Sequence, residues 1–508
     1  MNIEQELAQI IALGNPSELD WSARSIAQLP SDFGRLAALR KLNLEDNDLV
    51  DLPSDFAELN TLEWLDLSDN IFTTIPVAVR ELKNLRWLDL SANQLQALPT
   101  GNISWTNLER LDLRSNNLQQ LPANIGAMKA LKKLLLDINE LTSLPAEIGQ
   151  LTALRWLDLS ENELSTLPKE MTSLKALEIL NLEGNAFQAF PEVLTTLENL
   201  SELDLSDCAL TDIPESVGAW SRLISLNLSA NAIEALPESI SQWVDLTSLD
   251  LSENQLKSLP TGFSSLSKLT RLNLEENPLD GMPEIITELH ALVELDLTDI
   301  QMTVLPDSIA KLSALEWLDL SVNQLKTLPT TIDKLTKLGW LDLKDNALTH
   351  FGMGLNNMPQ LRELYAAYNE LELIDFNPSE LKSLERLDLS FNQLRKLPDN
   401  IGEMKNLNWL NVEENVLDRL PDSIGDLCHL EELDLSDNQL SDLPESCSKL
   451  TNLRTLDLRN NNFKTLPKCI AALADSLQAL FIAENPLSVK EKERIRAEFP
   501  LLVLDIEG

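Results

Sequence analysis

Six tryptophans occupy one position of a repeating pattern and are the residues of this chain best suited to molecular recognition. They are separated by 23 residues or by multiples of 23: Trp64, Trp87, Trp156, Trp317, Trp340 and Trp409. Tryptophan, tyrosine and arginine dominate the hot spots of protein interfaces, because each combines a large contact area with a polar group. The chemistry predicted by this spacing is non-covalent binding on a surface where the repeats line up. The alternative is that the tryptophans only stack on one another, since neighbours such as Trp64 and Trp87 can cover each other.

The stretch LRELYAAYNELELIDFNP, residues 361–378, adds the two tyrosines of the chain, Tyr365 and Tyr368. When repeats of 23 residues are stacked, three of the tryptophans and two cations fall beside these tyrosines. We predict one principal partner-binding site from this group: Trp317, Trp340, Lys344, Tyr365, Tyr368, Arg386, Phe391 and Trp409. An irregular repeat without function and a surface for self-association are the two alternatives.

A second predicted zone contains the other three tryptophans, Trp64, Trp87 and Trp156, together with basic residues. The basic residues are Arg86, Arg110, Arg114, Lys132, Lys133 and Arg155. Aromatic anchors and guanidinium groups together favour an acidic segment of a partner protein. The alternative is that these cations only neutralise Asp66, Asp89, Asp112 and Asp158.

Residues for catalysis or metal binding do not form a pattern. The three histidines, His290, His350 and His429, fall in distant repeats, and no phosphate-binding loop, HExxH or GxSxG motif occurs. The four cysteines, Cys208, Cys428, Cys447 and Cys469, lack CxxC spacing and are expected to be buried, reduced thiols. We expect no enzymatic activity, no cofactor and no metal.

The charge balance limits the partners. With 81 acidic against 40 basic residues, the formal net charge is -41, which repels nucleic acid and anionic membranes. The first twenty residues have no basic region of the signal-peptide type, and no stretch of eighteen apolar residues occurs. We therefore expect a cytoplasmic protein with protein partners.

The elements that position these residues follow from two columns with the same period. Asparagine stands at 17 of 19 positions from Asn47 to Asn461, and the exceptions are Cys208 and Ile300. Proline stands at 18 of 20 positions from Pro30 to Pro467, and the exceptions are Gly352 and Asp375. Each unit reads LxxLxLxxNxLxxLPxxIxxLxxL, in which LxL has the two-residue period of a strand. The second half has helix-like spacing, with proline suited to a first helical turn.

One such unit cannot bury its leucines alone, so the units must stack into a solenoid. The predicted fold class is an α/β solenoid, a horseshoe with a parallel concave β-sheet and short helical or 3-10 segments on the convex side. Residues six, four, two and one before each asparagine should face the concave surface, whereas Trp21, Trp105, Trp220 and Trp243 replace core leucines. The asparagine column should satisfy backbone groups of the turn after each strand.

The repeat motif resembles the 23-residue leucine-rich repeats of intracellular Ras-group-type proteins, which include the Ras/Raf scaffold, yeast adenylate cyclase repeats and similar bacterial proteins. The resemblance covers about residues 19–487. It implies a leucine-rich-repeat fold and a partner such as a small GTPase or another signalling protein, bound on the concave face.

The two ends of the chain are expected to cap the repeats. Residues 2–13 should form a short amphipathic helix, and SVKEKERIRAEFP, residues 488–500, a charged helix. The domains are then an N-terminal cap (1–18), a solenoid of about 21 repeats of 23 residues (19–487) and a C-terminal cap (488–508).

The function predicted from these observations is that of a non-catalytic, monomeric scaffold or adaptor that binds proteins on its concave face. The alternative is a structural or stress-related solenoid without a dedicated partner. A glycan ligand would be favoured by a signal peptide, which the first residues do not resemble.

Overall fold

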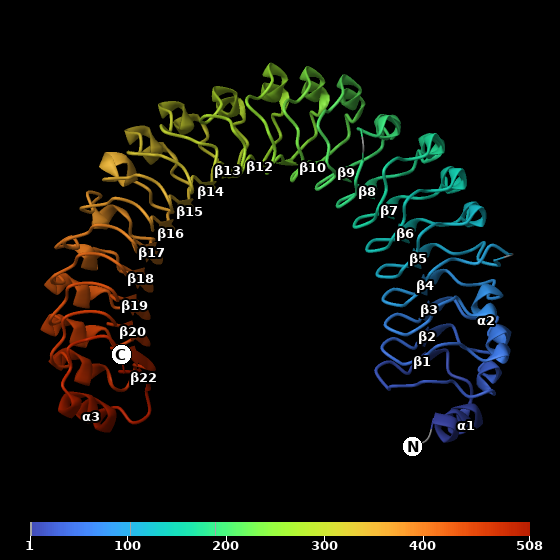
Figure 1. Ribbon diagram of the computed structural model, residues 1–508, viewed down its shortest axis with the longest axis horizontal. Coiled ribbons are helices and arrows are strands. Elements are labelled where there is room, and N and C mark those ends of the chain that lie inside the picture. The colour runs from blue at the N-terminus through green and yellow to red at the C-terminus, as the bar shows by residue number, and fades with distance from the viewer. Residues whose placement is uncertain (1–2, 102, 188, 508) are drawn as a thin grey trace. The chain divides into compact units, whose positions relative to one another are not determined.

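The computed structural model describes residues 3–101, 103–187 and 189–507. The chain divides into two compact units, Met1–Gln255 and Leu256–Gly508. In each unit the strands lie side by side along the concave side and short helices lie along the convex side (Figure 1). This is the predicted solenoid with a parallel sheet on one face.

In the first unit, consecutive three-residue strands pair in parallel, each shifted by one repeat from the last. The strands are β1 (Glu18–Asp20), β2 (Lys41–Asn43), β3 (Trp64–Asp66), β4 (Trp87–Asp89), β5 (Arg110–Asp112), β6 (Lys133–Leu135), β7 (Trp156–Asp158), β8 (Ile179–Asn181), β9 (Glu202–Asp204), β10 (Ser225–Asn227) and β11 (Ser248–Asp250).

The second unit repeats this arrangement. Its strands are β12 (Arg271–Asn273), β13 (Glu294–Asp296), β14 (Trp317–Asp319), β15 (Trp340–Asp342), β16 (Glu363–Tyr365), β17 (Arg386–Asp388), β18 (Trp409–Asn411), β19 (Glu432–Asp434), β20 (Thr455–Asp457), β21 (Ala479–Phe481) and β22 (Val503–Asp505).

The convex segments are mainly 3-10 helices. In the first unit they are Phe33–Arg35, Ser54–Glu58, Ala123–Ala127, Ala146–Gln150, Lys169–Ser173, Glu192–Thr196, Glu215–Ala219 and Glu238–Gln242. In the second unit they are Thr261–Ser265, Glu284–Glu288, Asp307–Lys311, Thr330–Lys334, Gly352–Leu355, Pro378–Glu380, Ile401–Glu403, Asp422–Asp426, Glu445–Lys449 and Lys468–Leu473.

The proline column stands just before the convex turns, as predicted. Pro145, for example, precedes the 3-10 helix Ala146–Gln150 with an extended conformation of φ -72 and ψ 152. Its carbonyl oxygen accepts a hydrogen bond from the Ile148 amide at 3.0 Å, so the proline ends the extended segment and opens the 3-10 turn. The 3-10 helix is five residues long, which suits this helix type because it is used in short pieces.

Three α-helices occur among the described residues: α1 (Ile3–Leu13), α2 (Val77–Arg80) and α3 (Val489–Glu498). The predicted N-terminal helix began at residue 2, which lies outside the described residues. Glu6 ties α1 to the first repeat, since its carboxylate accepts from Trp21 Nε1 at 3.0 Å and pairs with Arg24 at 2.9 Å.

Helix α3 follows the last complete repeat of the second unit and leads to β22. Ser488 caps the helix by accepting a hydrogen bond from the Glu491 amide, and Ile495 is fully buried. The Glu491 carboxylate also accepts from the Leu466 amide at 2.9 Å. These contacts fix the helix against the repeats. The predicted C-terminal cap ended at Gly508, which lies outside the described residues.

The core of each unit is a continuous stack of leucines, and Trp21, Trp105, Trp220 and Trp243 are buried in it as predicted. Buried asparagines run beside the leucines. The Nδ2 group of Asn162 donates to the carbonyls of Leu136, Leu159 and Ser160 at 3.0, 3.1 and 3.0 Å, and its Oδ1 accepts from the Leu141 amide at 3.0 Å. The asparagine column is therefore the predicted hydrogen-bond ladder.

Two of the four columns expected on the concave face behave differently. The carboxylates four before the asparagine are buried or half-buried, because each folds back onto the residue two positions later. Asp66 Oδ1, for example, accepts from the Ser68 amide at 3.0 Å and from its hydroxyl at 2.6 Å. The residue directly before the asparagine lies in the turn after the strand, with a positive φ, and is exposed in most repeats.

The expectation of four buried thiols is wrong for Cys428. All four cysteines are free, and Cys208, Cys447 and Cys469 are buried, but Cys428 is exposed. It stands one repeat after Lys405 and one repeat before Thr451, in a column that faces solvent on the convex side.

The two repeats without proline keep the short convex turns. Gly352 opens the turn Gly352–Leu355 with a φ of +67, and Asn377 caps the turn Pro378–Glu380 by accepting from the Ser379 amide. Asp375, which replaces a proline, accepts a hydrogen bond from the Phe351 amide at 2.9 Å through its carboxylate. The substitution therefore replaces a conformational restraint by a hydrogen bond between neighbouring repeats.

Candidate partner-binding surface

The first residue of each strand, six before the asparagine, forms the column that carries the tryptophans. Trp64, Trp87, Trp156, Trp317, Trp340 and Trp409 all begin a strand and are all partly exposed, as predicted. The leucine that follows points into the core, so the tryptophan must lie on the opposite face of the sheet.

In the first unit, Trp64 and Trp87 lie on adjacent strands and stack with ring centroids 4.3 Å apart and an interplanar angle of 8°. Cations cover the two outer sides of this pair. The Lys41 ammonium lies 4.5 Å from the centroid of Trp64, and the Arg110 guanidinium 5.5 Å from that of Trp87. The flat faces of both rings are thus occupied by neighbours in the sheet.

Trp156 is separated from that pair by β5 and β6. The Lys133 ammonium lies 2.9 Å from its ring centroid, a cation–π contact. Burial and the nearby Arg110 guanidinium lower the pKa of Lys133. Trp156 and the Trp64–Trp87 pair are therefore two separate aromatic groups.

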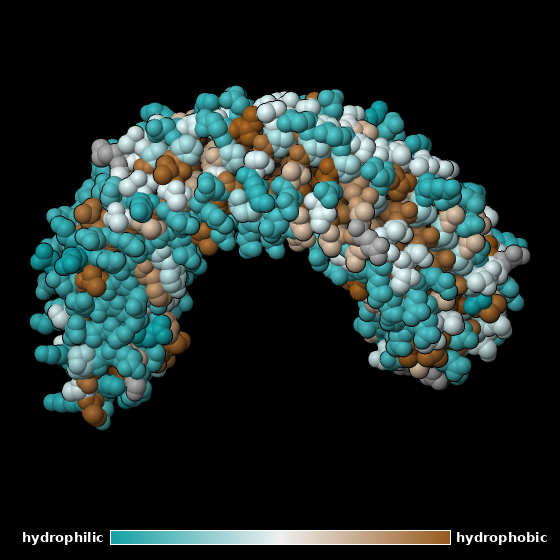
Figure 2. Space-filling view, turned by 45° about the horizontal axis from the view of Figure 1, so that its top comes forward, coloured by the Kyte–Doolittle hydropathy of each residue, from teal (hydrophilic) through white to brown (hydrophobic). Residues whose placement is uncertain are grey.

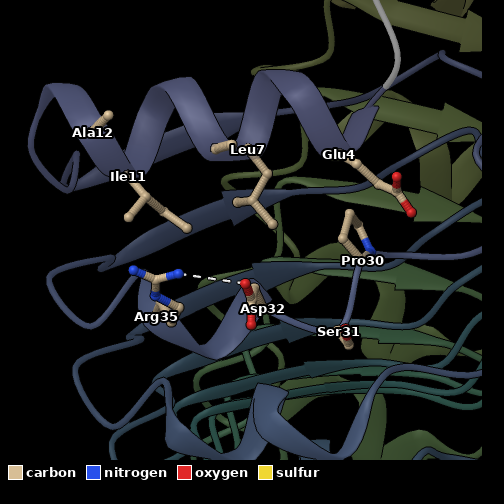
Figure 3. Close-up of a pocket in the computed structure, with 9 residues that line it drawn as sticks. Glu4, Leu7, Ile11, Ala12, Pro30, Ser31, Asp32 and Arg35 are labelled. Atoms are coloured by element: carbon tan, nitrogen blue, oxygen red, sulfur yellow. Dashed lines mark hydrogen bonds and ion pairs between the residues drawn. The ribbon is translucent and has the colours of Figure 1, made fainter.

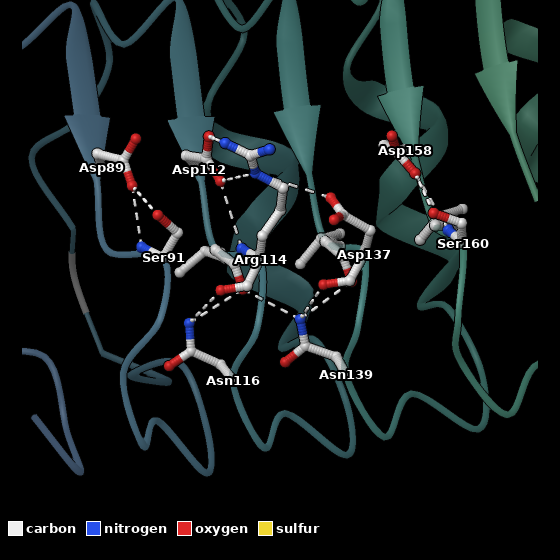
Figure 4. A network of polar contacts seen from close by, with 12 residues as sticks. Asp89, Ser91, Asp112, Arg114, Asn116, Asp137, Asn139, Asp158 and Ser160 are labelled. Carbon is white, nitrogen blue, oxygen red and sulfur yellow. Dashed lines mark hydrogen bonds and ion pairs between the residues drawn. The ribbon is translucent and has the colours of Figure 1, made fainter. Parts of the chain in front are cut away.

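Arg114 is already paired with the Asp112 carboxylate (Figure 4), and Arg110 approaches the same carboxylate. Asp112 is fully buried, and Arg114 binds it through two hydrogen bonds of 2.9 Å while Arg110 Nη2 approaches at 3.0 Å. The hydrogen bond to Asp112 raises the pKa of Arg114. This geometry fits the alternative raised for these cations, neutralisation of the aspartate column.

Three other cations assigned to this face lie just outside it. Arg86, Lys132 and Arg155 each precede a strand by one residue. Arg86 and Lys132 both bind Glu109, at 3.0 and 2.6 Å, and Arg155 pairs with Glu178. They form cross-strand ion pairs along the edge where the strands begin.

In the second unit the predicted residues come together on β14 to β18 and the turns that follow these strands. Trp317 and Trp340 stack at 4.5 Å and 9°, and Tyr365 lies against Trp340 at 5.8 Å with a tilt of 51°. The Tyr365 hydroxyl donates a hydrogen bond to Glu363, and burial raises the pKa of this tyrosine to about 12. Tyr365 stands between Asp342 and Asp388 in the ladder, as predicted.

The turns after β16 and β17 carry the second part of the cluster. Tyr368 and Phe391 stack at 4.2 Å with an interplanar angle of 7°, and Lys344 Nζ lies 5.5 Å from the Tyr368 ring. Arg386 covers Trp409 at 4.7 Å. All eight residues of the predicted principal site therefore lie on five adjacent strands and their turns.

Carboxylates crowd the same strands. Burial raises the pKa of Asp342 to about 7, with Asp319 and Asp388 as further causes, and burial raises the pKa of Glu413. In the first unit burial raises the pKa of Asp89 and of Asp137 to about 6. The strands of both units thus carry carboxylates whose pKa is raised by burial.

Sequence reasoning missed a hollow beside Trp340. Gly339 stands in the column that carries Glu316 and Arg362 in the neighbouring repeats, and it lines a hollow of about 620 Å³ together with Lys337 and Glu363. A glycine in a column of long side chains is the signal that could have found it.

A second cavity, of about 490 Å³, lies between α1 and the first convex turn (Figure 3). Leu7 and Ile11 point from the helix toward Pro30 and toward Arg35, which pairs with Asp32 at 3.4 Å. None of the predicted site residues lines it. Its position is that of a seam between the helix and the repeats.

The surface of each unit visible in Figure 2 is mostly hydrophilic, and apolar residues form small separate areas. Within the described ranges, no cluster of three or more His, Cys, Asp or Glu side chains is arranged to hold a metal ion. No helix in the same ranges is both long enough and apolar enough to cross a bilayer.

Comparison with protein families identifies the repeats. A model described as leucine rich repeat matches residues 37–95, 83–139, 129–187, 198–256, 221–279, 290–348 and 382–440. A model of two leucine rich repeats matches residues 359–402 and 428–474. No individually curated protein sequence matches the chain.

Solved structures give the same assignment. The chain is similar to a leucine-rich repeat protein of Leptospira interrogans, with 31% identity, 98% of each chain covered and a TM-score of 0.51. It is also similar to the plant peptide hormone receptor RGFR1 in complex with RGF2, with 27% identity, 98% and 88% coverage and a TM-score of 0.70. A third similar structure is the Arabidopsis receptor kinase HAESA in complex with the peptide hormone IDA and the co-receptor SERK1. It has 28% identity, covers 98% of this chain and 92% of its own, and has a TM-score of 0.59.

Proposed function

This chain belongs to the leucine-rich repeat proteins, and from that premise we propose that it is a non-catalytic scaffold that binds a protein on the sheet face of its second unit. The observation that carries this proposal is the cluster on β14 to β18. There, two stacked aromatic pairs, Trp317–Trp340 and Tyr368–Phe391, lie partly exposed. Large aromatic side chains at such a position suit the centre of a protein interface.

Two similar structures support the choice of ligand class, since RGFR1 and HAESA are both in complex with peptides. The first unit supports it less. Its stacked pair is covered by cations on both outer sides, and its arginines are held by Asp112. We therefore place the principal contact in the second unit.

The finer proposal is a cytoplasmic, monomeric adaptor in intracellular signalling, of the Ras-group type, with a small GTPase or another signalling protein as partner. Free thiols support a reducing compartment, because Cys447 and Cys469 are neighbours that stay unlinked and Cys428 is exposed. The acidic composition supports a protein partner over nucleic acid.

The test compares two matched tryptophan pairs. In one variant Trp317 and Trp340 become serine; in the other, Trp64 and Trp87, which stack almost identically at 4.3 Å and 8°, become serine. Each full-length chain is used to capture proteins from a cell extract, and captured proteins are quantified by mass spectrometry. We expect a partner bound by the wild type and by the first-unit variant, and weakened at least about tenfold by the second-unit variant.

Circular dichroism and the melting temperature establish that both variants are folded. Loss of the partner from the first-unit variant instead would move the binding site to Trp64 and Trp87. Equal capture by all three chains would favour a structural or stress-related solenoid without a dedicated partner.

A further inference from the structure

The residue before each asparagine of the ladder has an unusual backbone conformation. In both units its φ lies near +50, from Asp46 at +53 to Glu484 at +54. Most of these residues are small or polar, namely Asp, Asn, Gly, Ser, Ala or Glu. The large apolar members of this column are Ile138, Val322, Tyr368 and Phe391.

A left-handed conformation is unfavourable for L-residues, and most of all for β-branched and bulky side chains. Val322 at +53, Tyr368 at +55 and Phe391 at +52 hold it nevertheless. Strain of this kind persists only where the surrounding structure imposes it, and it is frequent at binding sites. We call these three residues the apolar ridge.

Burial does not compensate for this strain. Val322 is 43% exposed and Tyr368 is 47% exposed. Phe391 is half-buried; its ring stacks on Tyr368 at 4.2 Å, and Lys344 Nζ lies 5.5 Å from the Tyr368 ring. Other repeats carry a polar residue at this position, such as Asp299 or Asp437.

The ridge is held in place by backbone hydrogen bonds between turns. The Val322 amide donates to the Lys344 carbonyl at 2.9 Å, and the Tyr368 amide donates to the Ser390 carbonyl at 3.1 Å. A surface fixed in this way loses little conformational entropy when a partner binds.

The charges beside the ridge determine the kind of partner. Asp345 lies in the ridge column between Val322 and Tyr368, and Glu414 follows Phe391 in that column. Asp342 and Asp388 lie on the strands beneath, where burial, and to a smaller extent Asp319 and Asp388, raise the pKa of Asp342. The nearby cations Lys344 and Arg386 face the rings of Tyr368 and Trp409.

We propose that the apolar ridge of Val322, Tyr368 and Phe391 binds an extended basic segment of a partner protein. This inference rests on the proposed function and specifies its partner. Apolar side chains of the segment contact Tyr368 and Phe391, while its lysines or arginines lie opposite Asp345 and Glu414. A basic segment relieves the repulsion among these carboxylates, whereas an acidic one adds to it.

The test selects peptides from a displayed random library of twelve-residue peptides on the full-length chain at neutral pH and physiological salt. The ridge variant carries Val322→Asn, Tyr368→Asn and Phe391→Asn, because Asn460 already occupies this column with a φ of +49. Ile138→Asn is the matched control, since it makes the same change at the same strained position of the first unit.

We expect the selected peptides to carry a net positive charge and apolar anchors. Their affinity should fall at least about tenfold on the ridge variant, decrease with added salt, and change less than about twofold on the control. The melting temperature of the ridge variant should equal or exceed that of the wild type, because asparagine relieves strain and removes exposed apolar surface.

Several results would overturn the inference. One is the selection of acidic or uncharged peptides. Another is equal binding of the peptides by the ridge variant and the wild type. A third is a melting temperature of the ridge variant below that of the wild type, because it would show that the ridge residues serve packing. Peptides that match the chain itself, with a mass that grows with concentration in sedimentation, would indicate self-association instead. Peptides lost from the Trp317→Ser and Trp340→Ser variant but kept by the ridge variant would contradict the ridge and leave the proposed function standing.

Discussion

The asparagine ladder shows how one side chain type can determine a local structure. The Asn162 side chain is buried and bonds to three carbonyls and to the Leu141 amide. The three carbonyls each accept a second hydrogen bond, from Asn139 Nδ2, Asn185 Nδ2 and the Ile138 amide. Leucine has a similar volume but no acceptor, so its presence would leave the buried Leu141 amide without the Asn162 oxygen.

Replacing Asn162 by leucine should therefore lower the free energy of unfolding by about 1 to 3 kcal/mol, the cost of leaving one buried backbone group unpaired. The measurement is the denaturant midpoint. Ile300→Leu is the matched control, because Ile300 occupies the same column, is fully buried and already lacks the ladder. Equal midpoints for Asn162→Leu and the wild type would contradict the role of the ladder.

Asp342 makes a second prediction about a single residue. Burial raises its pKa to about 7 from an unfolded value of 3.8, so between these values the folded state binds more protons than the unfolded state. Its contribution to stability is complete below pH 3.8 and is lost as the pH rises through about 7.

Asp342→Asn should consequently gain stability relative to the wild type between pH 5 and pH 8. Asparagine fits the column, as Asn411 shows in the same unit. Melting temperatures at several pH values provide the measurement, and Asp46→Asn, which removes an exposed carboxylate, is the control. A difference in melting temperature that stays constant with pH would show that Asp342 is not the titrating group.

At the scale of the element, the sequence was sufficient for the strands and the repeat, because buried leucines with a two-residue period leave one solution. It predicted the register of Trp317, Trp340 and Tyr365 for the same reason, since each repeat has the same length. The convex turns were less predictable. Proline restricts its own φ angle in the same way before an α-helix as before a 3-10 helix, so it does not distinguish the two. The 3-10 geometry instead follows from packing five-residue turns side by side.

The aspartate column and the turn after the strand could not be predicted from periodicity. Alternation places Asp66 on the open face, but the Ser68 hydroxyl and amide draw its carboxylate against the backbone, and the neighbouring strands cover it. The positive φ of Val322 or Tyr368 is also absent from the pattern, because the column accepts many residue types. The left-handed conformation and the place of Val322 beside Tyr368 and Phe391 are therefore findings of the structure, whereas Tyr368 and Phe391 themselves were predicted as site residues.

At the scale of the whole molecule, the dominant property is a formal net charge of -41. Two electrostatic effects oppose each other. Cross-strand ion pairs such as Arg40–Glu63 and Arg454–Glu431 attract, but both are exposed and such pairs contribute about 0 to 1 kcal/mol each. Repulsion among the excess carboxylates acts at every repeat, so it should outweigh the pairs.

Added salt should therefore stabilise the protein. Between about 0.01 M and 0.15 M sodium chloride the screening length falls from about 30 Å to about 8 Å, which removes repulsion between distant repeats while leaving contacting groups less affected. We expect the melting temperature at pH 7.4 to rise over this range. The same titration near pH 4 is the control, because the sequence pI is about 4.3, so acidic and basic charges nearly balance there and the salt effect should nearly vanish. A melting temperature at pH 7.4 that falls with salt would mean that the ion pairs along the strand edges, and not the excess charge, dominate the electrostatics of the folded chain.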